Sequence, residues 1–134
     1  MDLIDRVRDI ARHHFESGGS SHRLDDALRV YRLGLHLSEQ EGADRQIVAL
    51  SALLHDIGRT EEDRSKGETC HAEKGADMAR KILSDEGLEE DKIDKIIHCI
   101  ATHRFRDNKQ PETTEAKVLF DADKLDSIGA VGIG

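Results

Sequence analysis

Residues 47–58 have the sequence IVALSALLHDIG, the longest nearly uncharged stretch of the chain. Apolar side chains would occupy almost every face of a helix here, so we expect that helix in the centre of a domain. It ends with His55, Asp56, Ile57 and Gly58, and Gly58 suits the left-handed backbone that often follows a helix. The stretch therefore predicts an imidazole and a carboxylate, side by side, at the end of a buried helix.

This His55–Asp56 pair is a candidate metal site. An ionised carboxylate buried without a partner is strongly unfavourable, so Asp56 must be neutralised, hydrogen-bonded or bound to a cation. Neighbouring helical side chains diverge by about 100°, but at a terminal turn both can point to one place beyond the helix end. Imidazole and carboxylate ligands suit Mn, Fe, Co, Ni, Zn or Mg.

The composition predicts one small helical domain. The chain has 134 residues, 37% of them hydrophobic, with one proline, three phenylalanines and one tyrosine. The formal net charge of -8 argues against nucleic acid or an anionic membrane as the main partner. Two cysteines are too few for a disulfide framework, and no stretch has the pattern of a membrane span or signal peptide. We therefore expect a soluble, cytoplasmic protein.

Apolar periodicity and capping residues predict six helices. We expect them over about 2–16, from a cap at Ser20 or Ser21 to Gly42, from Asp44 to Gly58, from Thr69 to about Glu86, around 93–101, and from Thr113 or Thr114 to about Ile128. Gly87 should end the fourth helix, and residues 59–67 should form a charged loop beside the metal. The tail at 129–134 is apolar and glycine-rich, so we expect that it continues or packs on a partner.

Three carboxylates interrupt the last apolar helix, namely Asp121, Asp123 and Asp126. Helical spacing places Asp123 and Asp126 within about 60° of each other and turns Asp121 away from Asp123. Three acids on an apolar helix are a second sign of a cation. The apolar neighbours do not show which acid faces the interior, so spacing alone leaves that choice open.

The sequence LLHDIG at 53–58 resembles the signature of the HD-domain metal-dependent phosphohydrolases. The sequence DADKLDSIGAVGI at 121–133 is especially similar to a bacterial and archaeal branch of this superfamily, some members of which cleave nucleotide phosphates or pyrophosphates. The resemblance covers residues 20–134. It implies an all-α orthogonal bundle of about six helices around a central metal. Residues 1–134 would form a single HD domain that lacks the further C-terminal helices of longer relatives.

The resemblance also implies metal ligands. It assigns His55, Asp56 and Asp123 to a divalent metal ion, and it selects Asp123 by its Ala-Asp-x-Leu context. Asp56 would both bind the ion and accept a proton from the attacking water.

An early histidine ligand of the superfamily pattern is replaced here by Asp26, which stands three residues before Arg29. A carboxylate at that position would favour a harder ion. The alternatives are that His22, one turn earlier, reaches the site, that the site is weakened, or that Asp26 forms a surface ion pair with Arg29.

Further residues are implied to act on the substrate. His71 and His103 would hold the substrate phosphate or a second ion, and His71 is expected near a helix N-terminus, which favours phosphate. Arg59, Lys124 and Arg29 are candidate phosphate-binding cations.

The resemblance implies metal-assisted hydrolysis of a phosphoester or phosphoanhydride in a small phosphorylated substrate, with a nucleotide favoured. The alternatives are a regulatory module that binds a nucleotide without cleaving it, a structural-metal protein and an oxygen-activating di-iron protein. The sequence does not reveal the base or sugar, and it leaves a homodimer open.

Overall fold

The computed structural model describes residues 2–17, 21–57, 71–103 and 110–132. These ranges contain six helices and no strand, so the predicted all-α fold is confirmed: α1 (Leu3–Ser17), α2 (Ser21–Glu41), α3 (Arg45–Leu54), α5 (His71–Asp85), α6 (Glu90–Thr102) and α7 (Thr114–Gly132). The α7 helix continues past the predicted end at about Ile128 and reaches Gly132. Gly58, Thr69 and the predicted loop at 59–67 lie outside the described residues.

Local capping sets the starts of α3 and α7. The Asp44 carboxylate accepts hydrogen bonds from the N–H groups of Gln46 (2.9 Å) and Ile47 (3.3 Å). The Thr113 hydroxyl accepts one from the N–H of Ala116 (3.1 Å). Both caps were predicted, and both satisfy backbone donors that have no partner within their helix.

Glycines with left-handed backbone follow α2 and α5. Gly42 has φ 71° and Gly87 has φ 79°. Beyond Gly87, the N–H of Leu88 donates to the carbonyl of Leu83 at 3.1 Å, which is the bond of a Schellman motif. The predicted ends of these two helices are confirmed.

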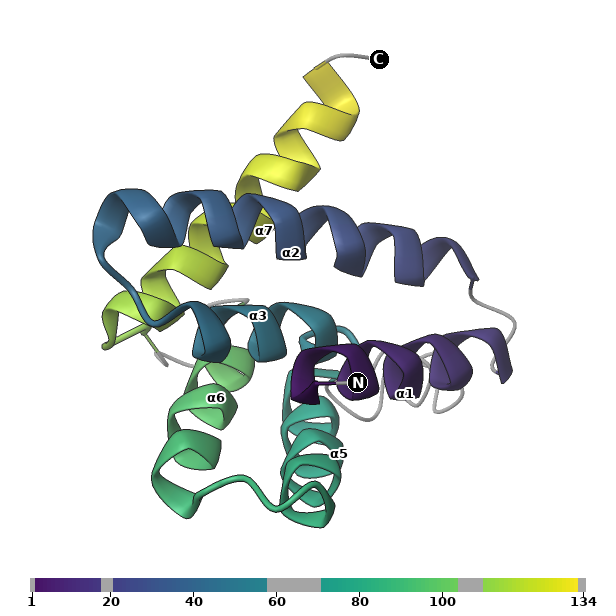
Figure 1. The fold of residues 1–134 in the computed structure, drawn as a ribbon. Helices are drawn as coiled ribbons and strands as arrows, with labels where there is room; N and C mark the ends of the chain where they lie inside the picture. The colour runs from purple at the N-terminus through teal and green to yellow at the C-terminus, as the bar shows by residue number, and fades with distance from the viewer. Residues whose placement is uncertain (1, 18–20, 58–70, 104–109, 133–134) are drawn as a thin grey trace.

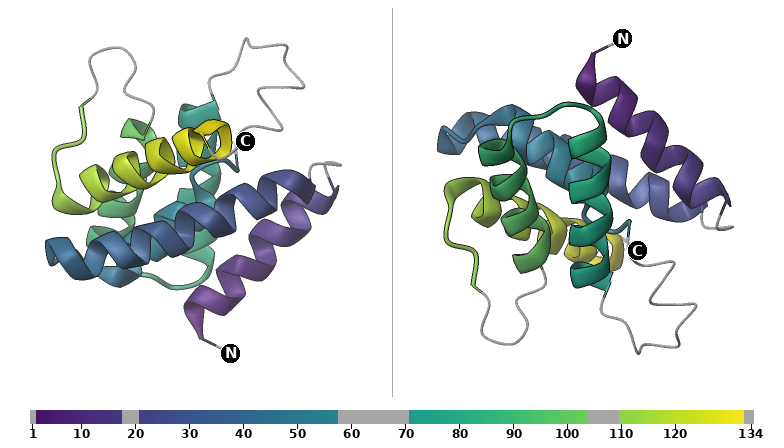
Figure 2. Two further views of the ribbon diagram at one scale, coloured as in Figure 1. Left: turned by 90° about the horizontal axis from the view of Figure 1, so that it is seen from above. Right: turned by 90° about the horizontal axis from the view of Figure 1, so that it is seen from below.

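The α3 helix lies at the centre of the bundle (Figure 1). All residues from 47 to 57 are buried. The α2 and α7 helices lie on one side of α3, α6 packs against another side with α5 beside it, and α1 runs alongside α2 and α3 (Figure 2). The C-terminal end of α3 is therefore enclosed by other elements, as the sequence predicted.

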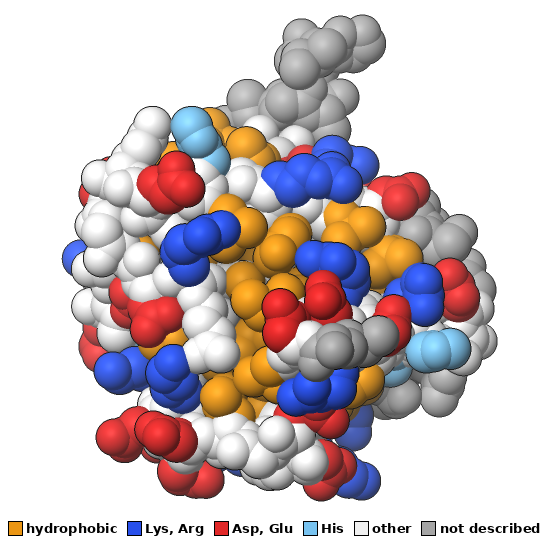
Figure 3. All heavy atoms as spheres, in the orientation of Figure 1, with side chains coloured by type: hydrophobic (Ala, Val, Ile, Leu, Met, Phe, Trp, Pro, Cys, Tyr) orange, Lys and Arg blue, Asp and Glu red, His pale blue; other side chains and the backbone are white. Residues whose placement is uncertain are grey.

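Charges of both signs lie on the face of the molecule that is drawn in Figure 3. On the face seen in Figure 1, acidic and basic side chains alternate around a strip of apolar atoms (Figure 3). Exposed ion pairs, such as that between Arg12 and Asp9 at 2.9 Å, contribute little to stability. No helix within the described ranges combines the length and apolar character needed to cross a membrane.

The α2 and α3 helices approach closely at Gly34. A Cβ atom at this position would lie only 2.8 Å from Cγ1 of Val48. We expect Gly34→Ala to lower the free energy of unfolding by about 1 kcal/mol, because overpacking costs about 1–3 kcal/mol and the higher helix propensity of alanine returns at most about 1 kcal/mol. Urea unfolding of the metal-free protein measures the change.

Val48→Ala is the matched control for this contact. It removes the methyl group that the new Cβ would meet, so the two substitutions should be less than additive in the double variant. A Gly34→Ala protein as stable as the wild type, or full additivity with Val48→Ala, would contradict the close approach.

Candidate metal centre

The end of α3 carries His55 and Asp56 into the interior. His55 directly follows the last helical residue and keeps helical backbone angles, with φ -62° and ψ -28°. Only 2% of His55 and 8% of Asp56 is exposed. Two polar groups in this low-dielectric surrounding require compensating charge or hydrogen bonds.

His103 follows α6 in the same way that His55 follows α3, with φ -65° and ψ -20°. The Nδ1–H of His55 donates to the carbonyl of Ala52 at 2.6 Å, and the Nδ1–H of His103 donates to the carbonyl of Ile100 at 2.5 Å. Because a carbonyl oxygen can only accept, Nδ1 must carry the hydrogen in both rings. In each neutral ring Nε2 is then the nitrogen that carries a lone pair and can bind a cation or a proton.

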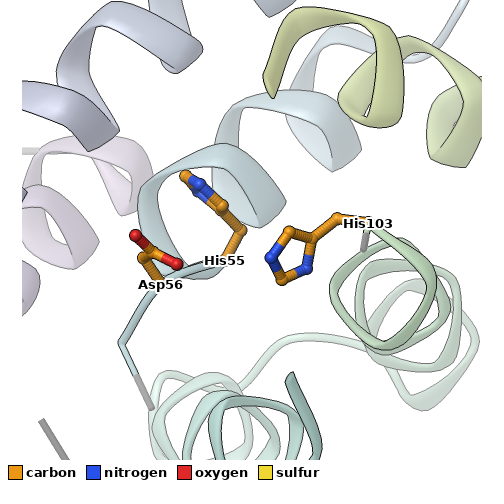
Figure 4. Close-up of side chains that lie close together, drawn as sticks. All are labelled: His55, Asp56 and His103. Atoms are coloured by element: carbon orange, nitrogen blue, oxygen red, sulfur yellow. The ribbon is translucent and has the colours of Figure 1, made fainter. Parts of the chain in front are cut away.

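Ligand atoms of His55, Asp56 and His103 all lie within 4.8 Å of one another. The two imidazole rings are nearly perpendicular, at 87°, with centroids 5.0 Å apart. Figure 4 shows the three side chains close together, two from the end of α3 and one from the end of α6. The predicted convergence of His55 and Asp56 beyond the helix end is present, and His103 joins them.

Asp123 adds a second carboxylate from α7. Its Oδ1 atom lies 3.6 Å from Nε2 of His55, and its side chain is 32% exposed. Of the other two acids on this helix, Asp121 is exposed and Asp126 bonds to Arg29. The acid that the resemblance selected is therefore the one that faces His55.

Burial and charge shift the protonation of these groups. Burial alone would lower the pKa of His55, but the carboxylates of Asp56 and Asp123 outweigh it and raise the pKa to about 9. Burial, together with the charge of His55, lowers the pKa of His103 to about 3. Burial favours the neutral form of Asp123, but hydrogen bonding to His55 and its charge lower the pKa of this carboxyl. At neutral pH the metal-free cluster therefore holds a protonated His55 and a neutral His103.

These donors fit a divalent metal ion. Two imidazole nitrogens and two carboxylates suit the ions that the sequence predicted, which are Mn, Fe, Co, Ni, Zn and Mg. The bonds from Nδ1 to backbone carbonyls fix both rings, as is usual for metal-bound histidines. A cation between them would replace the positive charge now carried by the proton on His55.

The chemistry of His103 favours a metal over a phosphate. In the neutral ring the only N–H is at Nδ1, and it is bonded to Ile100. The Nε2 atom therefore presents a lone pair, which binds a cation but gives no hydrogen bond to a phosphate oxygen.

Asp26 is paired with Arg29, which also donates from Nε to Oδ1 of Asp126 on α7 at 2.9 Å. The surface ion pair that was one of the sequence alternatives is thus present, and the ligand role of Asp26 stays a prediction. Sequence reasoning did not find Asp126 as a partner of Arg29, because 97 positions separate the two.

The remaining predicted site residues are less fully described. His22 lies near the start of α2 and His71 begins α5, as expected, but their side chains lie outside the described part of the structure, as does all of Arg59. Lys124 is exposed on α7 beside Asp123. The substrate-binding roles of these residues stay predictions.

Comparison with known proteins identifies the family. The family model described as HD domain matches residues 23–128, which is most of the chain. The chain belongs to the HD domain family. The resemblance drawn from the HDIG and DADKLD segments is thereby confirmed.

Individual relatives agree with this assignment. The HD-domain chain is 31% identical to the uncharacterized protein YpgQ of Bacillus subtilis over 99% of its own length and 64% of YpgQ. It is 28% identical to Ribonuclease Y of Chloroflexus aurantiacus over 90% of its length, but only 21% of that protein. The crystal structure of a predicted HD superfamily hydrolase from an uncultured Thermotogales bacterium matches with a TM-score of 0.83 and 31% identity, over 96% of this chain and 71% of that one. The chain thus spans less than two thirds of both named sequence relatives.

Metal binding to this HD domain should release a proton. Because the pKa of His55 is raised to about 9, its Nε2 must lose a proton near pH 7 before it can bind a cation, whereas His103 is already neutral. We expect release of about one proton per ion, and an apparent affinity for Mn²⁺ that rises about tenfold per pH unit from about pH 6 to about pH 8. Calorimetric titration in buffers of different ionisation enthalpy counts the protons.

His36→Ala is the control for this titration, since His36 is an exposed histidine of α2. It should leave both the affinity and the proton count unchanged, and His55→Ala should abolish both. An affinity that is independent of pH over this range would contradict binding through His55.

Proposed function

We propose that this HD domain is a metal-dependent phosphohydrolase that cleaves a phosphoester or phosphoanhydride of a small phosphorylated substrate, with a nucleotide as the favoured class. The observation that carries the proposal is the convergence of His55, Asp56 and His103 in a buried cluster with Asp123 beside it. Membership of a superfamily of hydrolases supports it. The net charge of -8 favours a small substrate over a nucleic acid.

The site residues divide the work between holding the ion and moving a proton. His55 and His103 bind through Nε2, and Asp56 and Asp123 bind through carboxylate oxygens. A divalent ion there supplies positive charge for the phosphoryl oxygens and lowers the pKa of a water. Asp56 is slightly exposed, at 8%, and its carboxylate accepts the proton of the attacking water.

The substrate phosphate needs positive charge in addition to that of the ion. The α5 helix begins at His71, and the free N–H groups of a helix N-terminus favour an anion. Lys124 adjoins Asp123 on α7, and Arg59 follows the turn at 55–57 in the sequence. We assign these groups to binding the phosphate.

One observation favours a second function. Asp26 stands where the superfamily pattern has a histidine, and its carboxylate is paired with Arg29. A cluster without a ligand from α2 could bind a metal and a nucleotide without cleaving the nucleotide, as a regulatory module does. Turnover by the metal-loaded protein separates this function from hydrolysis.

The test is hydrolysis of nucleoside mono-, di- and triphosphates in the presence of Mn²⁺, Mg²⁺, Co²⁺ or Zn²⁺. We expect release of phosphate or pyrophosphate that requires the ion and stops on chelation. Asp56→Asn should lower kcat by about 10²–10⁴-fold at saturating metal, because the proton acceptor is lost.

His36→Ala serves again as the matched control and should keep full activity. Binding of nucleotides by the metal-loaded wild type with no product formed would support the regulatory module. If the metal-loaded protein neither binds nor cleaves any of these substrates, the nucleotide class is rejected for this site.

A further inference from the structure

Arg29 links α2 and α7, the second of which carries Asp123 beside the cluster of His55, Asp56 and His103. From α2 its guanidinium reaches Asp126 on α7, with Nε donating to Oδ1 at 2.9 Å, while Nη2 bonds to Asp26 on its own helix. Asp126 is only 15% exposed, whereas Arg29 is 46% exposed. The guanidinium therefore lies at the surface and binds a mostly buried carboxylate of α7.

Asp126 lies one helical turn beyond Asp123. Residues three apart share a face of a helix, so the face of α7 that meets Arg29 is also the face that turns toward His55. Within the described part of the chain, the contact recorded for the Asp123 carboxylate is with Nε2 of His55, and at 3.6 Å it is longer than a tight hydrogen bond. The placement of Asp123 thus depends on how α7 is held.

We propose that Arg29 is a positioning residue for the metal centre: by binding Asp126 it fixes the rotation of α7 that brings the Asp123 carboxylate to His55. The inference rests on the proposed metal site and adds a residue that does not itself touch the ion. It also gives Arg29 a different task from phosphate binding, because two carboxylates already balance its charge and accept hydrogen bonds from its Nε and Nη2 atoms.

The chemistry of arginine suits this task. Its planar fork presents Nε and Nη2 in fixed relative positions, so one side chain binds Asp126 and Asp26 at once. A lysine carries its three N–H donors on one nitrogen, so it does not reproduce the fixed spacing between Nε and Nη2. The pairing with Asp26 holds the guanidinium in the direction of α7.

The test compares Arg29→Gln with Arg80→Gln. Arg80 is a matched control, because it also joins two helices by bonds to two carboxylates, Glu90 at 3.0 Å and Asp94 at 2.8 Å, and it is 42% exposed. Its partners lie near the start of α6, at the opposite end from His103. The dissociation constant for Mn²⁺, measured without substrate, and the thermal unfolding of the metal-free protein are the two readouts.

We expect Arg29→Gln to weaken Mn²⁺ binding by about tenfold, the usual effect of losing a residue that orients a ligand. Arg80→Gln should leave the dissociation constant unchanged. Both variants should unfold at nearly the same temperature as the wild type, because exposed ion pairs add little to global stability. Arg29→Lys should recover part of the lost affinity.

A double-mutant cycle with Asp123→Asn shows whether Arg29 acts through Asp123. In the Asp123→Asn protein, adding Arg29→Gln should cause no further loss of Mn²⁺ affinity. Additive losses, or an Arg29→Gln protein that binds Mn²⁺ as tightly as the wild type, would overturn the positioning role and leave the metal site intact. A wild type that binds no divalent ion would overturn the proposed function as well.

Discussion

The burial of charge at the end of α3 is the constraint on which the rest of this site depends. His55 and Asp56 lie among apolar side chains, with 2% and 8% of their surface exposed. Ionised groups are tolerated in such a place only when neighbouring groups compensate them. The α7 helix brings the Asp123 carboxylate to the protonated His55, and α6 adds the neutral ring of His103 to the same cluster. The candidate metal site is therefore also the place where the fold must compensate buried charge.

Two helix ends meet at the cluster, and this arrangement favours a cation. His55 and His103 each follow the last residue of a helix, and each ring is held by the carbonyl three residues earlier. The carboxyl end of a helix carries a partial negative charge, so two such ends add to the potential of the carboxylates. In the metal-free protein the proton on His55 balances the carboxylates of Asp56 and Asp123, which raise the pKa of that residue.

The sequence predicts those parts of the structure that depend on near neighbours. Several helix boundaries depend on contacts within a few residues, and the observed boundaries agree with the predicted ones at Asp44, Thr113, Gly42 and Gly87. His55 and Asp56 are adjacent, so their shared location was also predictable.

Contacts between distant segments were not predictable from spacing. Which acid of α7 is a metal ligand depends on what lies opposite that helix. Spacing alone did not choose among Asp121, Asp123 and Asp126, and the resemblance to known sequences selected Asp123. The bond between Arg29 and Asp126 depends on how α2 and α7 cross, and no local pattern records it.

The most direct test of the metal centre is an anomalous-scattering map at the Mn absorption edge, from crystals of this protein grown with Mn²⁺. We expect an anomalous peak from Mn²⁺ within bonding distance of Nε2 of His55, Nε2 of His103 and a carboxylate oxygen of Asp56. A peak bound elsewhere on the chain, or no peak near His55 in crystals that hold Mn²⁺, would contradict it.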